Sequence, residues 1–233
     1  DVPIFALPFG IFPTERGRRS GIIAPAYGES DRGRYLLHLG YYWAINDYMD
    51  WSIRGDGYTK GSWTLYSDIR YALRYDFSGG ISASFAKTIS GERRDPNYNN
   101  QKVFNVHWGH NQEFDPTTRL VVDFTLSSSS YYQNTSYQLN DLLRQEITSN
   151  ATLSKSWEGT PNSMTINVSR RQNLRPTPGS LEISDALPSL SFNRGQSFPF
   201  RFGKKSNASS ESQAWYELIG YTYSAQALNT RNQ

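Results

Sequence analysis

The feature that most constrains this chain is a repeated alternation of apolar and polar residues between Tyr35 and Leu126. A period of two is the pattern of a β-strand, because successive side chains of a strand point to opposite faces. In residues 62–74 one face carries Trp63, Leu65, Ile69, Tyr71 and Leu73. The other face carries Thr64, Tyr66, Asp68, Arg70, Ala72 and Arg74. Regularly placed charges indicate that this second face meets water.

The preceding run alternates in the same way. One expected face carries Tyr35, Leu37, Leu39, Tyr41, Trp43 and Ile45, and the other carries Leu36, His38, Gly40, Tyr42 and Ala44. An apolar outer face that ends in Trp and Tyr, opposite a polar inner face, is typical of a transmembrane β-barrel. The sequence therefore predicts an all-β fold, an antiparallel transmembrane β-barrel segment.

The composition fits this fold. Mean hydropathy is −0.65, which is polar, yet aromatic residues make up 15% of the chain. A barrel accommodates both values, because only every second strand residue meets lipid and the loops are polar. The sequence has no run of about 18 apolar residues, which excludes a helical membrane span.

Charge, cysteine and histidine content limit the chemistry. The net charge of +3 is too small to indicate a nucleic-acid partner, and the absence of cysteine removes disulfides, thiolate metal sites and cysteine nucleophiles. His107 and His110 are three residues apart, so a strand would place them on opposite faces rather than on one metal ion. Common catalytic motifs are absent. We therefore expect no metal, no cofactor and no catalytic residue, and the chain is not predicted to be an enzyme.

The chain divides into two regions, a proline-rich arm with a first short strand at residues 1–33 and the antiparallel barrel segment at residues 34–233. Pro3, Pro8 and Pro13 interrupt an apolar stretch, and Pro25 ends a second one. Proline lacks the N–H that a strand donates to its neighbour, so these stretches are expected to be edge strands or extended arms. Because the sequence opens at Asp1 without a signal peptide, we expect either a processed chain or an internal piece of a longer protein.

Roughly ten strands of a larger barrel are expected in the second region. Their approximate ranges are 34–45, 48–59, 62–74, 77–90, 102–112, 118–128, 146–157, 162–171, 186–192 and 213–227. Short turns mostly alternate with long loops, which is the pattern of outer-membrane barrels. Two connections break the alternation: residues 60–61 are short on the long-loop rim, and residues 193–212 are long on the short-turn rim.

Three sets of residues are candidates for function. Tryptophans on the outward face or at strand ends predict an interfacial aromatic girdle, although core packing in a soluble β-sandwich would use the same residues: Trp43, Trp51, Trp63, Trp108 and Trp157. Charged residues on the polar face are expected to form ion pairs across a watery lumen: Arg54, Asp56, Asp68, Arg70, Arg74 and Asp123. A cluster of arginines could contact lipid phosphates or form a solvated turn: Arg16, Arg18 and Arg19.

Several stretches resemble the start of the barrel domain in the LptD family, the lipopolysaccharide-assembly proteins of the outer membrane. These stretches are Val2-Pro3-Ile4-Phe5 with Pro8 and Pro13, Arg18-Arg19-Ser20-Gly21-Ile22-Ile23-Ala24-Pro25, Gly40-Tyr41-Tyr42-Trp43-Ala44-Ile45 and Asp50-Trp51-Ser52-Ile53. The likeness is specific over residues 2–75. After residue 75 only the succession of strands and turns is similar, although Leu187-Pro188-Ser189-Leu190-Ser191-Phe192 resembles a later strand of the family.

The resemblance implies a very large barrel in the outer membrane of a Gram-negative bacterium. Such a barrel receives lipopolysaccharide from a periplasmic LptA-like bridge, holds an LptE-like lipoprotein as a plug, and releases its cargo into the outer-membrane lipid through a lateral gate. Pro25, and less closely Pro13, would be gate prolines, and Arg16, Arg18 and Arg19 would be headgroup contacts near the seam. The alternatives are a complete small barrel acting as a passive pore or a membrane hydrolase, and a soluble β-sandwich binding module.

Overall fold

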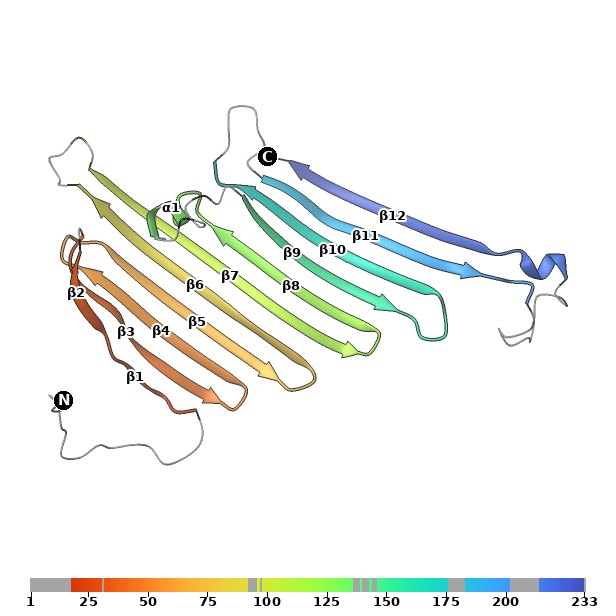
Figure 1. Cartoon of the computed structure of the whole chain (residues 1–233), viewed down its shortest axis with the longest axis horizontal. Helices are drawn as coiled ribbons and strands as arrows, with labels where there is room; N and C mark the ends of the chain where they lie inside the picture. The colour runs from red at the N-terminus through yellow and green to blue at the C-terminus, as the bar shows by residue number, and fades with distance from the viewer. Residues whose placement is uncertain are drawn as a thin grey trace, which may run out of the picture.

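A computed structural model of the chain describes residues 18–30, 32–91, 96, 98–135, 139, 143, 146–175, 183–201 and 214–232. Pro13 and Arg16 lie outside these residues. The described chain forms one twelve-stranded antiparallel sheet (Figure 1). Both β1 (Gly21–Ile23) and β2 (Ala26–Ser30) pair with β3 (Gly33–Asn46), and from β3 to β12 (Tyr221–Asn232) each strand pairs with the next one in the chain. The sheet is not closed, and its two edges are β1 with β2 on one side and β12 on the other. The predicted antiparallel all-β fold is therefore confirmed.

The strands are β1 (Gly21–Ile23), β2 (Ala26–Ser30), β3 (Gly33–Asn46), β4 (Met49–Tyr58), β5 (Trp63–Leu73), β6 (Phe77–Ser90), β7 (Asn99–Asp115), β8 (Thr118–Ser127), β9 (Glu146–Ser156), β10 (Asn162–Asn173), β11 (Ile183–Ser197) and β12 (Tyr221–Asn232). Two short helices accompany them, α1 (Tyr131–Thr135) and the 3-10 helix η2 (Trp215–Leu218). No helix among the described residues is long and apolar enough to cross a membrane.

Most of the predicted strand ranges agree with the structure to within a few residues, but three do not. The strands predicted at 102–112 and 186–192 extend to Asn99–Asp115 and Ile183–Ser197, because the backbone ladder continues through polar residues. The first part of the range 213–227 holds η2, so β12 begins only at Tyr221. The short strand expected before Pro25 is also followed by a second one, β2.

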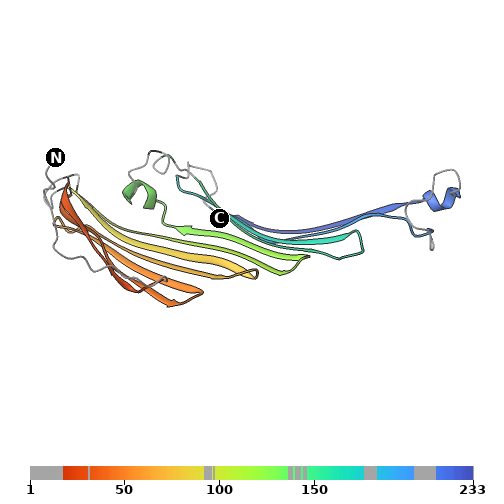
Figure 2. The same ribbon diagram turned by 60° about the horizontal axis from the view of Figure 1, so that its bottom comes forward.

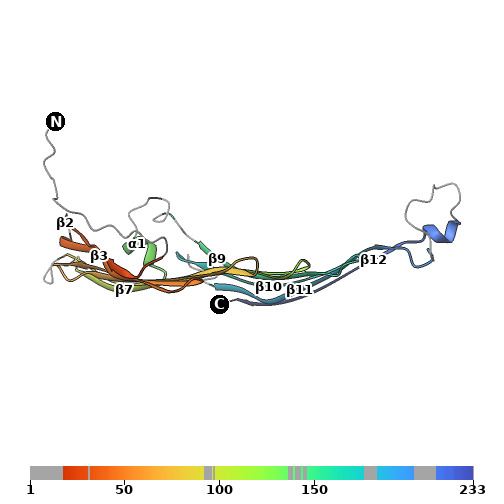
Figure 3. The same ribbon diagram turned by 90° about the horizontal axis from the view of Figure 1, so that it is seen from below.

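The sheet is a single layer. Seen edge-on in Figure 3, the strands form one sheet, and among the described residues no second layer covers its apolar face. Leu65 on that face is 47% exposed and Trp43 is 48% exposed. A soluble sandwich would bury this face against another sheet, so that alternative does not agree with the structure.

Strand register keeps the two faces separate across many strands. On the polar face Ser52, Asp68, Ser82 and His107 lie opposite one another in turn, and on the apolar face the matching row is Trp51, Ile69, Ile81 and Trp108. Trp51 lies near the start of β4, whereas Trp108 lies in the middle of β7. This stagger is the register shift that accompanies strand tilt in a barrel.

A β-bulge at Leu37 and His38 corrects the expected faces of β3. Leu36 pairs with Gly57 and Leu39 pairs with Gly55, so two residues of β3 stand opposite Asp56 alone. One extra residue moves every side chain beyond it to the other face. Tyr35 and Leu37 therefore lie on the polar side, and Leu36 lies on the apolar side with 41% of its surface exposed.

Most connections follow the predicted alternation, with tight turns on one rim and longer connections on the other (Figure 1). The two expected exceptions are present, since the β4–β5 turn is short and the β11–β12 connection, which contains η2, is long. At the β7–β8 turn, hydrogen bonds from the hydroxyl and the backbone N–H of Thr117 lower the pKa of Asp115 to about 2. On the opposite rim α1 folds onto the concave face of the sheet (Figure 2). Its Tyr131 hydroxyl is 2.6 Å from Ser84 Oγ, and Asn134 donates to Gln101 Oε1 at 2.7 Å.

Candidate functional site at the proline-broken edge

The N-terminal edge of the sheet is an interrupted strand. The three residues of β1 pair with Tyr42, Tyr41 and Gly40, and the five residues of β2 pair with residues 33–37. Ala24 and Pro25 lie between the two ladders and belong to neither. Proline supplies no N–H and cannot continue a ladder. The sequence therefore breaks the pairing of this edge in the middle of its length.

The neighbouring ladder is irregular at the same place. The bulge at Leu37 and His38 lies opposite the break at Pro25, and His38 has a positive φ of 61°. The carboxylate of Asp56 accepts the backbone N–H of His38 at 2.7 Å, and its Oδ1 is 3.4 Å from His38 Nδ1. Asp56 is buried. This carboxylate holds the bulge in place. At the same position along its length, β3 therefore pairs irregularly with both the β1–β2 edge and β4.

Near the short-turn rim the start of the edge is attached by an arginine clamp, formed by Arg18, Asp50 and Arg70. Arg18 Nη1 donates to Asp50 Oδ2 at 3.0 Å, and Arg70 Nε donates to Asp50 Oδ1 at 3.2 Å. The Asp50 side chain is only 8% exposed. A buried carboxylate needs charged partners to offset its desolvation. The clamp therefore joins the segment before β1 to strands β4 and β5.

The concave face beside this edge is polar. Arg54 Nη2 lies 2.6 Å from Asp68 Oδ2, and farther along the wall His107 Nδ1 lies 3.6 Å from Asp123 Oδ1. A hollow of about 750 Å³ is bordered by Arg54, Asp68 and His107 and also by Ile23 of β1. The polar hollow thus reaches the interrupted edge, where a bound molecule would lie next to the break between the β1 and β2 ladders.

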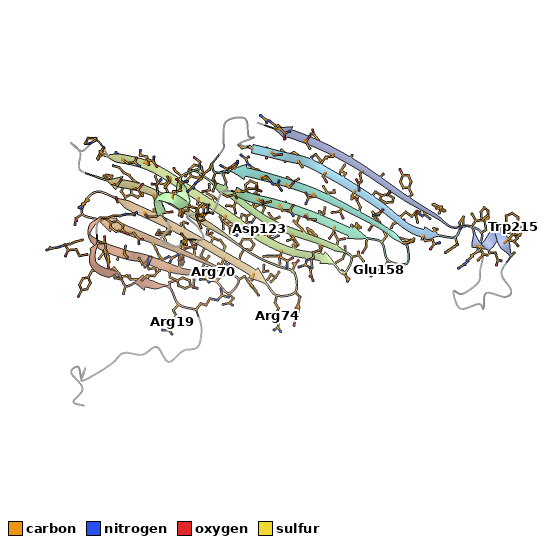
Figure 4. All side chains as sticks on the ribbon, turned by 45° about the horizontal axis from the view of Figure 1, so that its top comes forward. Arg19, Arg70, Arg74, Asp123, Glu158 and Trp215 are labelled. Atoms are coloured by element: carbon orange, nitrogen blue, oxygen red, sulfur yellow. The ribbon has the colours of Figure 1, made fainter. Side chains whose placement is uncertain are left out.

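The register places most of the predicted lumen residues on one face: Arg54, Asp56, Asp68, Arg70 and Asp123. Arg74 differs, because it lies in the turn after β5 with its guanidinium 4.8 Å from the Tyr75 ring centre. In Figure 4, Arg70 and Asp123 lie over the sheet, whereas Arg19, Arg74 and Glu158 lie along the short-turn rim. Arg18 and Arg19 are exposed.

The five tryptophans are on or beside the apolar face, at different heights. Trp43 and Trp51 stack with ring centres 6.2 Å apart near the short-turn rim, and Trp157 follows β9 on the same rim. Trp63 begins β5 on the opposite rim, and Trp108 is in the middle of β7. Four of them therefore lie near strand ends, as a girdle requires, and Trp108 lies within the apolar band.

Sequence reasoning missed Asp50 and the His38–Asp56 contact. Counting outward from the β4–β5 turn would have paired Asp50 with Arg70, since these residues are directly opposite in the ladder. The bulge gave a weaker signal: Leu36 and Leu37 are consecutive apolar residues, which interrupts the alternation of β3 but does not show where the extra residue lies. Asp56 was expected only as one of several lumen charges.

Comparison with known proteins gives a consistent result. The family model described as "LptD protein" matches residues 1–233. The LPS-assembly protein LptD of Actinobacillus pleuropneumoniae serotype 7 (strain AP76) is 32% identical over 134 residues, 56% of this chain and 17% of that protein. Its counterpart in Chromobacterium violaceum is 30% identical over 212 residues, 86% of this chain and 25% of that protein. The counterpart in Pseudoalteromonas translucida (strain TAC 125) is 24% identical over 203 residues, 87% of this chain and 25% of that protein. The chain thus spans a quarter or less of the length of these relatives.

Proposed function

We propose that this chain, which belongs to the LptD family, is a barrel segment of an outer-membrane translocon that inserts lipopolysaccharide into the outer leaflet through a lumen and a lateral gate. The observation that carries the proposal is the interrupted edge, where the ladder stops at Pro25 and the neighbouring ladder bulges at His38. The names of the relatives, which are LPS-assembly proteins, support the choice of cargo.

The energetics favour this edge as the gate. Opening a seam within a membrane leaves backbone N–H and C=O groups without partners, and each such group costs several kcal/mol. Because β1 has only three residues and Pro25 has no N–H, few backbone groups lose a hydrogen-bond partner when this edge opens. The same opening at the ladder between β6 and β7 would break pairing along fourteen residue pairs. A lateral opening is therefore less costly at the β1–β2 edge than at the β6–β7 ladder.

The two faces of the sheet match the two parts of the cargo. Sugars and phosphates would travel along the polar concave face past Arg54, Asp68 and His107, while acyl chains leave sideways into lipid. Arg18 is bound to Asp50 in this structure, so it could reach a lipid phosphate only by leaving the clamp. Arg19 and Arg16 remain proposed headgroup contacts, and Pro13 remains a proposed gate proline.

The partners follow from the same proposal. An LptE-like lipoprotein would occupy the lumen as a plug, and an LptA-like bridge would deliver the cargo from the periplasm. A complete small barrel that acts as a passive pore or as a hydrolase is less well supported, because the matched relatives are named for LPS assembly.

A disulfide trap in the full-length protein tests the gate. One cysteine replaces Ile22 of β1, whose side chain is 79% exposed, and the second is placed along the final strand of the complete barrel. The crosslink should stop lipopolysaccharide from reaching the cell surface, and a reducing agent should restore it. Surface lipopolysaccharide is measured by labelling intact cells.

A matched control crosslinks Leu65→Cys to Phe85→Cys, which are directly opposite in the regular β5–β6 ladder. This crosslink should leave delivery unchanged. If the closed seam formed quantitatively and delivery continued at the normal rate, the lateral gate would not be at this edge.

A further inference from the structure

Two lysines stand directly opposite each other on the apolar face of the sheet. Lys87 of β6 pairs with Lys102 of β7, and on its other side Lys87 faces Trp63 of β5. Like charges directly opposite each other on neighbouring strands repel and destabilise the pair. Within the described part of the chain, neither ammonium group has a hydrogen bond or an ion pair. The folded sheet therefore holds two adjacent positive charges that nothing in the described structure neutralises.

The next row toward the middle of the strands is apolar and aromatic. It consists of Leu65, Phe85 and Phe104, which are 47%, 40% and 39% exposed. The ring centres of Trp63 and Phe85 are 5.6 Å apart. A molecule that places an anionic group on the two lysines would thus lay any attached hydrocarbon along exposed aromatic rings.

The position of the lysines along the strands indicates which side of a membrane they meet. They lie near the end of β6 and the start of β7, on the rim with the longer loops, which in outer-membrane barrels is the outer side. From Phe77, at the start of β6, to Lys87 the strand advances by ten residues (87 − 77). At ~3.3 Å per residue and a tilt of ~40°, this is about 25 Å, the height of the lipid-facing band of such barrels.

The opposite end of the same face is built differently. There the Tyr71 hydroxyl is 3.0 Å from His110 Nδ1, and His110 Nε2 is 3.2 Å from Gln112 Oε1. These polar groups satisfy one another, so they need no external partner. On the apolar face of β5 to β7, the lysines and arginines without an ion pair thus lie only at the long-loop end.

We propose that Lys87 and Lys102 bind a phosphate of a phosphorylated glycolipid in the outer leaflet, as a boundary-lipid site on the outside of the barrel. A phosphate between the two ammonium groups neutralises both, and lysine is a common phosphate ligand. The acyl chains of the lipid lie along Phe85 and Phe104. The site rests on the proposed function in one respect, since it requires that this face meets the outer leaflet, but it is separate from the gate at β1.

The test uses the full-length protein, purified with its plug and placed in nanodiscs containing bisphosphorylated lipid A. Bound lipid is counted by native mass spectrometry. The double variant K87Q/K102Q should retain at least fivefold less lipid A than the unmodified protein, and K87R/K102R, which keeps both charges, should retain it. Lys155→Gln is the matched control, because Lys155 is on the same face at the short-turn rim and donates to Thr118 Oγ1.

Two further lipids test whether the site requires the phosphate and the glycolipid of lipid A. Dephosphorylated lipid A should bind the unmodified protein no better than it binds K87Q/K102Q, and phosphatidylglycerol should be displaced by lipid A. The proposal is overturned if the double variant keeps its lipid A, if loss of phosphate changes nothing, or if phosphatidylglycerol binds equally well. Heat-dependent gel mobility shows whether each variant is folded.

The gate crosslink makes the two proposals separable. Normal lipid A retention by K87Q/K102Q, together with a crosslink that still stops delivery, would remove this site and leave the translocon. Loss of lipid A with a crosslink that has no effect would support the site and remove the gate.

Discussion

Asp50 fixes the position of an edge strand with one carboxylate. Its two oxygens accept from Arg18, which precedes β1, and from Arg70 of β5. The pairing is asymmetric, because Asp50 is buried while the side chains of Arg18 and Arg70 are 51% and 71% exposed. The carboxylate therefore contributes the desolvated charge, and the guanidinium groups can exchange with water. A contact of this kind holds the segment before β1 against β4 and β5 without making the attachment permanent.

Replacing Asp50 with Asn removes the charge and keeps the shape. Loss of a buried partner can cost 3–5 kcal/mol, but solvent screening of two exposed arginines reduces this to about 1–2 kcal/mol. Amide hydrogens of residues 21–23 should then exchange about tenfold faster, since 1.4 kcal/mol is a factor of ten. Asp68→Asn, which loses the ion pair with Arg54 of β4 but no hydrogen bond to the segment before β1, should leave this exchange unchanged. Unaltered exchange in Asp50→Asn would show that the clamp does not hold β1.

At the scale of elements, β1 and β2 act as one strand with a missing centre. Both are antiparallel to β3, and the break at Pro25 coincides with the β3 bulge that Asp56 stabilises. A bulge increases local twist and leaves a residue unpaired. The two irregularities together weaken the same stretch of the wall, whereas β5, β6 and β7 pair without register shifts.

Pro25→Ala returns an N–H to this edge. We expect β1 and β2 to join into one strand, with a gain of about 1 kcal/mol for each added hydrogen bond. Hydrogen exchange of residues 21–30 should slow, and delivery of lipopolysaccharide to the cell surface should slow with it. Pro116→Ala, in the β7–β8 turn, is the control and should affect neither. Faster delivery in Pro25→Ala would contradict a gate that depends on missing pairing.

At the scale of the whole molecule, the sheet is a curved wall with staggered strands (Figure 2). The transverse row from Trp51 to Trp108 begins near the rim and reaches the middle of β7, as tilted strands require. Residues that are neighbours across the sheet therefore lie at different depths in a bilayer. The aromatic residues cannot all form one girdle, and their depths are a test of the tilt.

Variants that each keep a single tryptophan, with the others replaced by Phe, report these depths. In bilayers whose acyl chains carry bromine near their middle, Trp108 should be quenched more strongly than Trp43 or Trp63, since Trp108 lies within the apolar band. Lipids brominated near the headgroup should reverse the order. Equal quenching of the three residues by both lipids would mean that the strands are not tilted as proposed.

The alternation of residue types determined most of the architecture by itself. A strand's period of two is a property of the local backbone, so the strands, their polar and apolar faces and the rhythm of turns follow from nearby residues. This is why β6 was predicted with its observed bounds and why His107 and His110 were correctly expected on opposite faces.

Only the tertiary structure decided the contacts that build the edge. The clamp joins Arg18 to Asp50 across 32 positions, and the bulge at His38 is held by Asp56 from another strand. Such contacts depend on register between strands, and an irregularity of one residue in β3 reverses the faces of Tyr35 and Leu36. Local sterics select a strand, but which side chains meet is set by pairing over long separations.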